Sequence, residues 1–486
     1  EVPGSEIERS LSRLTESGLV ATDDSHGHEQ FLFRHVLIQE AAYGTLLRAD
    51  RKRLNLRLLE QLQGSNSEVA RNEPERLAHY AAEGDQPGIA ARYWLEAGLA
   101  ALANSAMPEA KARIRRGLAC AKRMAEDDER NQCELQLQLA LGKALIATAG
   151  YSVPETAAAF ERALELCTTK EDRPELLAVL HGLWIIDLLC GRLESAKKRA
   201  DELLKVAERL GDPVWIVVGC RARGVLAYPL GNFADSISYL ERGLKTFEES
   251  RRPEYSKILV DDPRVVMLMY LGLSQCGLGL IEDALSTSAE AVAEAHRLDH
   301  PYSLAQALSG EISVFILSHR MEGAASRVSE LARVTSEHEI VYHGVVAEIQ
   351  RGYVAFKNGA TREAISIMSG GLAGYRKTGS VLYVPTYQMW LVEALIADGQ
   401  YDAALDEISS AEKLIAETQM ACHSAGIAML RAEVHRRLGD YHAARSAIEQ
   451  AIDTAKNQGA LFYADQYREA LAKLDLEMPK MRQIQA

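Results

Sequence analysis

Apolar residues recur at helical spacing along most of the chain, in paired segments separated by short turns. The stretch 421–460 shows the unit most clearly. One helical pattern ends at Leu438, a turn follows at Gly439, and a second pattern runs from Tyr441 to near Gly459. A unit that repeats every roughly 20–50 residues is typical of a repeat array. The pattern therefore predicts an all-α chain of stacked helical hairpins.

The turn residue recurs with a period of 40 residues. It is found at Gly439, Gly399, Gly359, His319 and Gly279, and again at Gly231 and Gly191. Small residues also keep the phase, and alanine is frequent five residues after the turn, as at Ala404 and Ala444. Small side chains at these positions let the two helices of a hairpin approach closely.

One step of the array is longer than the others. Gly231 and Gly279 are 48 residues apart, and the extra eight residues follow Pro253, in the segment Glu254–Pro263. This insertion is either a tolerated surface loop or an element that contacts a partner, because insertions in repeat arrays gather on one face. Asp261 and Asp262 have no nearby basic partner in the sequence, so we expect them to be solvated loop carboxylates.

The order of residues around each turn (small, Gly, aromatic, Ala) resembles the tetratricopeptide repeat, although the unit has 40 residues instead of about 34. The resemblance covers 174–478 and implies a right-handed superhelix whose first helices line a groove. The groove positions counted from the turns include Tyr228, Ser313, Tyr353, Phe356, Glu393, Glu433 and Arg436. These residues are candidates for partner binding, and the alternative is that they form ordinary superhelix core.

The first 63 residues carry a different pattern. A helix is predicted over Glu6–Gly18, followed by two short strands around Val20 and Phe31–Arg34 and by further helices. This order is the outline of a winged helix. Residues 74–170 predict helical hairpins that do not keep the 40-residue phase, and we interpret them as degenerate repeats that cap the array.

The stretch Phe33–Leu54 reads FRHVLIQEAAYGTLLRADRKRL. It resembles the junction in bacterial class III adenylate cyclases that carry an ATPase module and a tetratricopeptide array. It departs from that phrase at Asn55, where the family usually has His. The junction residues that the resemblance implies are Phe33, Arg34, His35, Gln39, Glu40 and Tyr43.

The same resemblance implies a catalytic head upstream of Glu1, with ATP and Mg²⁺ bound by the parent protein. The chain opens with Glu-Val-Pro instead of Met, so we read it as a piece of a longer protein. A winged helix can bind DNA, and Arg48, Arg51 and Arg57 lie on one basic helix, but in this family the fold is a structural hinge.

Composition narrows the chemistry. The net charge of −13 argues against broad binding to nucleic acid or anionic membranes, and the seven cysteines form no CxxC pair, which favours reduced thiols in the cytoplasm. The sequence contains no GxxxxGK[ST] phosphate loop and no HExxH motif. We therefore predict no catalytic residue, no metal site and no cofactor within this chain.

The resemblance to the adenylate cyclase junction and to the tetratricopeptide repeat implies a regulatory or sensor arm. It would bind a protein, a peptide or a small ligand and control an upstream ATPase switch and adenylate cyclase output. The sequence does not decide whether the chain forms a homodimer. The alternatives are the regulatory arm of an ATPase-type transcription activator and a free-standing interaction scaffold. The C-terminal sequence LAKLDLEMPKMRQIQA lacks the helix-turn-helix that such activators usually carry.

Overall fold

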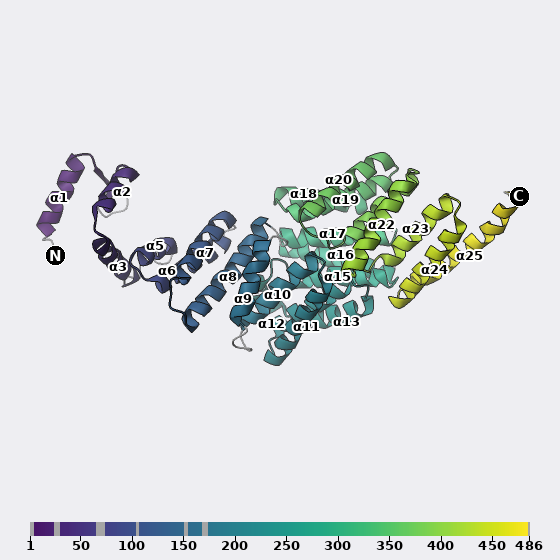
Figure 1. Ribbon diagram of the computed structural model, residues 1–486, viewed down its shortest axis with the longest axis horizontal. Coiled ribbons are helices and arrows are strands. Elements are labelled where there is room, and N and C mark those ends of the chain that lie inside the picture. The colour runs from purple at the N-terminus through teal and green to yellow at the C-terminus, as the bar shows by residue number, and fades with distance from the viewer. Residues whose placement is uncertain are drawn as a thin grey trace. The chain divides into compact units, whose positions relative to one another are not determined.

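The computed structural model describes residues 4–23, 30–64, 73–103, 106–149, 154–167 and 174–484. These residues are predominantly helical, which confirms the all-α prediction (Figure 1). The chain divides into two units, Glu1–Ala144 and Leu145–Ala486. None of the described helices combines the length and apolar character that a membrane span requires.

The first unit opens with a helix, a two-stranded antiparallel hairpin and a helix, in the order that the sequence predicts. The elements are α1 (Gly4–Glu16), β1 (Val20–Asp23), β2 (Gln30–Phe33), α2 (Val36–Thr45) and α3 (Arg48–Gly64). Val20 pairs with Phe33 in the hairpin. The winged-helix assignment and its role as a hinge stay predictions, because helix, hairpin and helix are common to many folds.

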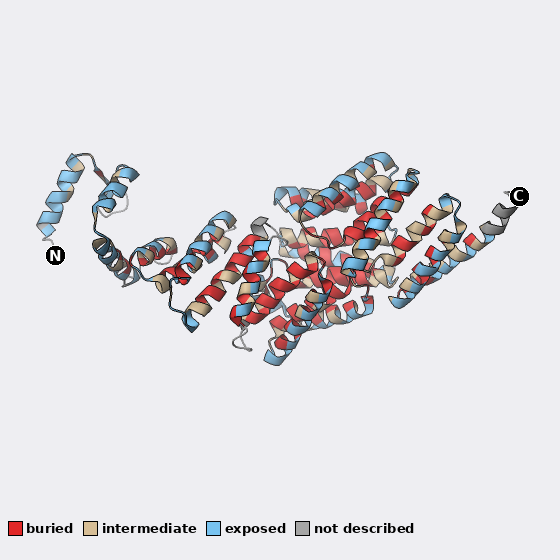
Figure 2. Ribbon diagram, in the orientation of Figure 1, coloured by how far each residue is buried: buried red, intermediate tan, exposed pale blue. Residues whose placement is uncertain are grey.

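The first unit continues as consecutive helices. They are α5 (Pro74–Glu83), α6 (Pro87–Ala103), α7 (Met107–Ala121) and α8 (Asp128–Ala149), and the boundary between the two units falls within α8. Leu77, Ala78 and Ile114 are fully buried where these helices pack. The elements α1 to α3 are largely exposed, as Figure 2 shows.

The second unit is the array of helical hairpins. Its helices are α9 (Pro154–Cys167), α10 (Pro174–Leu189), α11 (Leu193–Leu210), α12 (Pro213–Ala227), α13 (Phe233–Thr246), η1 (Glu249–Arg251), α14 (Arg252–Ile258), α15 (Pro263–Gly277), α16 (Ile281–Leu298), α17 (Pro301–Leu317), α18 (Ala324–Glu337), α19 (Val341–Lys357), α20 (Thr361–Lys377), α21 (Val384–Ala397), α22 (Tyr401–Thr418), α23 (Ser424–Arg437), α24 (Tyr441–Asn457) and α25 (Leu461–Ile484). The first helix of each hairpin packs on the second, and each hairpin packs on the next.

The small residues do what the repeat pattern predicts. Five residues after the turn, Ala196, Ala284, Ala364, Ala404 and Ala444 are all 0% exposed. At the same position Ser236 is also fully buried, and its hydroxyl donates to the carbonyl of Gly224 at 2.8 Å. A larger side chain here would force the paired helices apart.

The array closes on itself through contacts between residues about 190 positions apart. The Val381 amide, before α21, donates to the Leu189 carbonyl at 2.9 Å. One hairpin later, the Cys422 amide donates to the Pro229 carbonyl at 3.1 Å. In the third such contact, the Tyr463 hydroxyl donates to the Cys276 carbonyl at 3.0 Å.

These three contacts form a regular series, which we call the closure. In the first two, the end of the first helix or the turn of an early hairpin meets the loop between two late hairpins, and in the third the C-terminal end of α15 meets the first turn of α25. The first helices of the hairpins therefore face an enclosed interior.

Candidate functional site

The interior of the second unit contains two neighbouring cavities. The larger has a volume of about 360 Å³, and its lining includes Tyr228, Cys276, Trp390, His423 and Tyr463. These residues come from both sides of the closure. Ligand pockets typically begin at about 300 Å³, so the larger cavity has the size of a small binding site.

The smaller cavity has a volume of about 140 Å³ and is richer in polar side chains. Its lining includes Arg221, Asp261, Gln306, Ser313 and His343. Five tyrosines also line it, namely Tyr270, Tyr302, Tyr342, Tyr383 and Tyr387. An aromatic wall with a few convergent polar groups is the usual composition of a ligand site.

A cluster of tyrosines joins the two cavities. The Tyr228 ring lies 5.9 Å from the Tyr270 ring and 6.1 Å from the Tyr383 ring, centroid to centroid. The Tyr383 hydroxyl donates to the Tyr270 hydroxyl at 2.8 Å. Burial raises the pKa of all three phenols above the usual value, so they stay neutral hydrogen-bonding groups at physiological pH.

Two histidines of the cavity linings, the half-buried His423 and the buried His343, carry no charge at neutral pH. Burial lowers the pKa of His423 and of His343 to about 4. The His423 Nε2 atom lies 3.4 Å from the Tyr228 hydroxyl, across the closure. Burial raises the pKa of the Cys276 and Cys422 thiols to about 11 and about 12, so both thiols are protonated at physiological pH.

Some of the predicted groove residues lie at this site. Tyr228 and Glu393 line the larger cavity, and Ser313 lines the smaller one. Tyr353 is 0% exposed and donates to Glu393 at 2.8 Å, while the Phe356 ring packs 5.8 Å from the Tyr353 ring. Some of the predicted groove residues therefore line the cavities, and others belong to the superhelix core.

Glu433 and Arg436 lie elsewhere. They form an ion pair with each other at 2.8 Å, and Arg437 joins Glu433 at 2.7 Å. Neither Glu433 nor Arg436 belongs to the lining of the two cavities. The structure therefore does not bring the late polar positions to the interior site.

The predicted junction residues lie in the first unit. His35 caps α2 by accepting from the Leu37 amide at 3.2 Å. Asn55 is 3% exposed and donates to the Tyr43 hydroxyl and to the Arg51 carbonyl, both at 2.8 Å. Asn55, at which this chain differs from the junction sequence of the cyclases, thus links α3 to α2 by a hydrogen bond. Phe33, Arg34, Gln39 and Glu40 are exposed.

The sequence prediction for Asp261 and Asp262 is wrong. Asp261 is 7% exposed and pairs with Arg221 at 2.7 Å, and Asp262 pairs with Arg252. Arg221 lies 40 residues earlier in the chain, one repeat away, so no local pattern links the two. Tyr302 and Tyr342 were also missed, although they stand 40 residues apart in the same phase of the repeat and could have been found that way.

Comparisons with known proteins agree with this architecture. No family model matches the chain. A crystal structure of a Rap protein complexed with Competence and Sporulation Factor superposes with a TM-score of 0.57 at 14% identity, over 76% of this chain and 99% of that chain. The fold is a tetratricopeptide-like helical superhelix. The resemblance to the tetratricopeptide repeat is thereby confirmed.

Two further proteins are similar to this chain. The protein R02095 of Rhizobium meliloti strain 1021 is 23% identical over 480 residues, which is 97% of this chain and 46% of that protein. The chain thus spans about half the length of this curated relative. A signal-transduction ATPase with a tetratricopeptide repeat sensor from Pyrococcus horikoshii is 13% identical, with a TM-score of 0.32, over 95% of this chain and 60% of that one. The adenylate cyclase resemblance stays a prediction.

Proposed function

We propose that this chain is the regulatory arm of a longer protein and that it binds a partner in the interior of its array. The observation that carries the proposal is that both sides of the closure line the larger cavity. Tyr228 and Cys276 come from early hairpins, and Trp390, His423 and Tyr463 come from late ones. A bound molecule would contact both sides at once.

This arrangement supplies a physical mechanism for regulation. A ligand shifts a conformational equilibrium only by the difference between its affinities for the two states. A molecule in the larger cavity would lose its contacts with one side when the closure opens, so it favours the closed array. A single coupling free energy then links ligand binding to the closed state of the array.

The size of the cavity limits the occupant. About 360 Å³ holds a small ligand or a few side chains of a peptide segment, and not a folded protein. The Rap protein of the same fold was crystallised with Competence and Sporulation Factor, which supports partner binding by such an array.

The output would lie in the remainder of the longer protein. The similarity to less than half of R02095 supports a parent with further parts. Following the resemblance of Phe33–Leu54, these parts are an ATPase switch and an adenylate cyclase head, which would use ATP and Mg²⁺. The arm itself contributes binding and no catalytic step.

The test is cAMP production by the full-length protein with the larger cavity filled. In Gly426→Leu, the new side chain enters this cavity beside the flexible Met389, whose sulfur would lie 3.0 Å from the added Cβ. Gly370→Leu is the matched control, because it makes the same change on an exposed helix position with no atom within 4 Å of the added Cβ.

We expect Gly426→Leu to change cAMP output several-fold and to blunt any response to an added ligand, and Gly370→Leu to behave as the unaltered protein. Equal outputs in all three would show that the interior does not regulate. If no form makes cAMP, the cyclase assignment is wrong.

A further inference from the structure

The eight-residue insertion brings a carboxylate into the smaller cavity. Asp261 Oδ2 accepts from Arg221 Nη2 at 2.7 Å and from Gln306 Nε2 at 3.3 Å. The Arg221 and Asp261 side chains are 4% and 5% exposed. The inserted segment, which is irregular in an otherwise regular array, thus places a carboxylate in the interior. Removing a charged group from water costs free energy.

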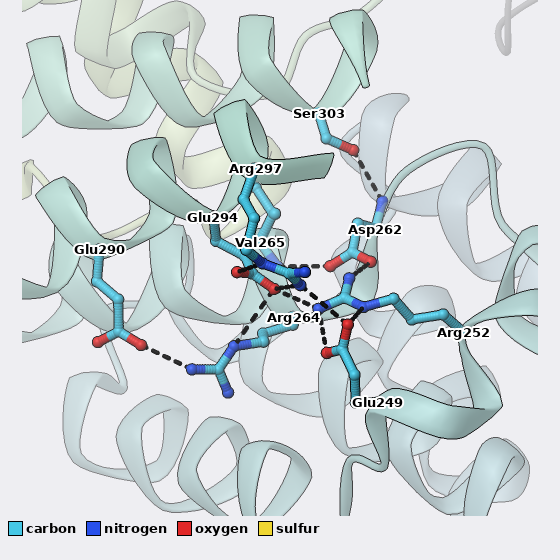
Figure 3. Close-up of polar contacts among 9 residues, drawn as sticks. All are labelled: Glu249, Arg252, Asp262, Arg264, Val265, Glu290, Glu294, Arg297 and Ser303. Carbon is cyan, nitrogen blue, oxygen red and sulfur yellow. Dashed lines mark hydrogen bonds and ion pairs between the residues drawn. The ribbon is translucent and has the colours of Figure 1, made fainter. Parts of the chain in front are cut away.

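A dense network of ion pairs holds the inserted segment in place (Figure 3). The Arg252 guanidinium, at the start of α14, pairs with Glu249, Asp262 and Glu294. Arg264 and Arg297 extend the network to Glu290 and Glu294 of α16.

The backbone at Asp261 is fixed as well. The Asp262 side chain caps α15 by accepting from the Val265 amide at 3.0 Å, and the Asp262 amide donates to Ser303 Oγ at 2.9 Å. Tyr255, in the same segment, is 1% exposed and stacks on Phe247. The insertion is therefore a built element and not a loose surface loop.

Among the described residues that line the smaller cavity, five buried polar atoms lack a hydrogen-bond partner: the donors Trp184 Nε1 and Arg221 Nε, and three acceptors. Asp261 Oδ1, Gln306 Oε1 and His343 Nε2 are buried and accept no hydrogen bond within the described chain. Each unpaired acceptor destabilises the folded chain, because it has lost its hydrogen bonds to water. A ligand that donates to these atoms would remove this destabilisation.

The role of His343 follows from its neighbours. The Ser309 hydroxyl lies 2.8 Å from the Ala305 carbonyl and 3.3 Å from His343 Nδ1, and when its proton occupies the shorter bond its oxygen accepts from His343 Nδ1. This assigns the proton of the neutral imidazole to Nδ1. His343 Nε2 is then an acceptor.

The walls define the shape and charge of the occupant. The His343 ring lies between Tyr302 and Tyr342, with centroid distances of 5.4 and 5.1 Å. A cavity of about 140 Å³ is close to one of about 150 Å³ that holds benzene. The ionised groups in the lining are Arg221 and Asp261, whose charges cancel, so a charged ligand would lose its hydration without a net opposite charge.

We infer that the smaller cavity binds an uncharged, single-ring compound that carries hydrogen-bond donors, such as a carboxamide or an amino-substituted heterocycle. Its donors pair with Asp261 Oδ1, Gln306 Oε1 and His343 Nε2, and its ring packs against the tyrosines. This inference rests on the proposed role of the interior as a binding site and names the ligand class of its smaller cavity.

Titration calorimetry of the 486-residue chain with benzamide tests the inference. Benzamide has one ring, no charge and two N–H donors. Benzoate and benzamidine, which are the anionic and cationic compounds of the same shape, are the comparison ligands. We expect saturable binding of benzamide and at least about tenfold weaker binding of both charged compounds.

Two variants locate the binding. Gln306→Leu removes one acceptor and keeps the Arg221–Asp261 pair, so it should fold and weaken benzamide binding roughly two- to tenfold. Asp261→Asn should weaken it as well if the variant folds. Asp465→Asn, on the exposed side of α25, should leave the affinity unchanged.

Each other outcome overturns the inference. These outcomes are no binding of benzamide to the folded chain, equal or tighter binding of benzoate or benzamidine, and binding that Gln306→Leu does not weaken. The readout is direct binding, so a negative result leaves the cAMP test of Gly426→Leu standing. The regulatory proposal and the ligand class therefore fail independently.

Discussion

The early and late turns of the array carry the same glycine in the same backbone conformation, but they have different surroundings. The turn glycines have positive φ angles of 72° to 90° at Gly191, Gly231, Gly279, Gly359, Gly399 and Gly439. A Cβ added at Gly279 would lie 2.5 Å from Phe462 Cβ, and one at Gly191 would lie 2.6 Å from Val381 Cγ2. At Gly359, Gly399 and Gly439 no atom lies within 4 Å.

This difference shows that one repeat signal serves two purposes. In every hairpin the glycine permits a left-handed turn, which other residues adopt only with strain. In the early hairpins it also permits the close approach of a loop from about 190 residues away. The local turn is encoded in each repeat, whereas the closure depends on which residues the superhelix brings to the turn.

The largest expected effect comes from breaking the ion pair in the interior that the closure encloses. Arg221→Leu leaves the Asp261 carboxylate buried without its guanidinium, and removing one partner of such a pair costs about 3–5 kcal/mol. Urea unfolding of the chain measures this loss. Arg362→Leu, at a side chain that is 90% exposed and pairs with Asp398, should cost less than about 1 kcal/mol. Equal losses would contradict the buried pair.

Adding one methyl group to an early turn glycine and to a late one tests this difference in surroundings. Gly279→Ala and Gly399→Ala both impose left-handed strain of about 1–2 kcal/mol. At Gly279 the clash with Phe462 should add a further 1–3 kcal/mol, roughly the cost of overpacking. The free energies of unfolding of the two variants give the answer. If the two losses are the same, the early turn does not contact the start of α25.

Acid should weaken the closed interior through His343. Its pKa is lowered from the usual 6.5 to about 4, so the unfolded chain takes up the proton first as the pH falls. The stability that neutral His343 retains at pH 7 is lost between about pH 6.5 and 4, and the loss at pH 5 is on the order of 2 kcal/mol.

Unfolding measured at pH 7 and pH 5 checks this expectation. His343→Gln should lose about 2 kcal/mol less than the unaltered chain over this interval, whereas the exposed His442→Gln should follow the unaltered chain. A His343→Gln variant with the same pH dependence as the unaltered chain would show that this histidine is solvated.

A smaller effect is expected at the third contact of the closure. Tyr463→Phe removes the hydrogen bond to the Cys276 carbonyl, which is worth about 1 kcal/mol. The thermal midpoint is the measurement, and Tyr441→Phe on the late hairpin is the control. The same small shift in both variants would show that the Tyr463 hydroxyl does not hold the closure.

The sequence predicted the parts of the fold that local spacing encodes. Glycine and alanine at fixed offsets predicted the hairpins, because close helix packing excludes larger side chains at those positions. The arginines eight residues before their turns also recur with the repeat, and each pairs with an acidic residue: Arg223 with Asp201, Arg351 with Glu348 and Arg431 with Glu412.

The site could be predicted only in part, because it is built across repeats. The offset count from the turns selected Tyr228, Ser313 and Glu393, which line the cavities. It could not select His423, whose partner Tyr228 lies 195 residues away. The offset count also could not select Asp261, because the inserted segment has no counterpart in the other repeats.

Hydrogen exchange at the Val381 and Cys422 amides tests the closure most directly, and the interior site depends on the closure. Both amides lie in loops, and their hydrogen bonds go to Leu189 and Pro229 of the early hairpins. Closure predicts that both exchange slowly, at rates near those of buried helical amides, and that the filled interior slows them further. Exchange at the rate of unbonded loop amides would contradict a closed array and, with it, the enclosed binding site.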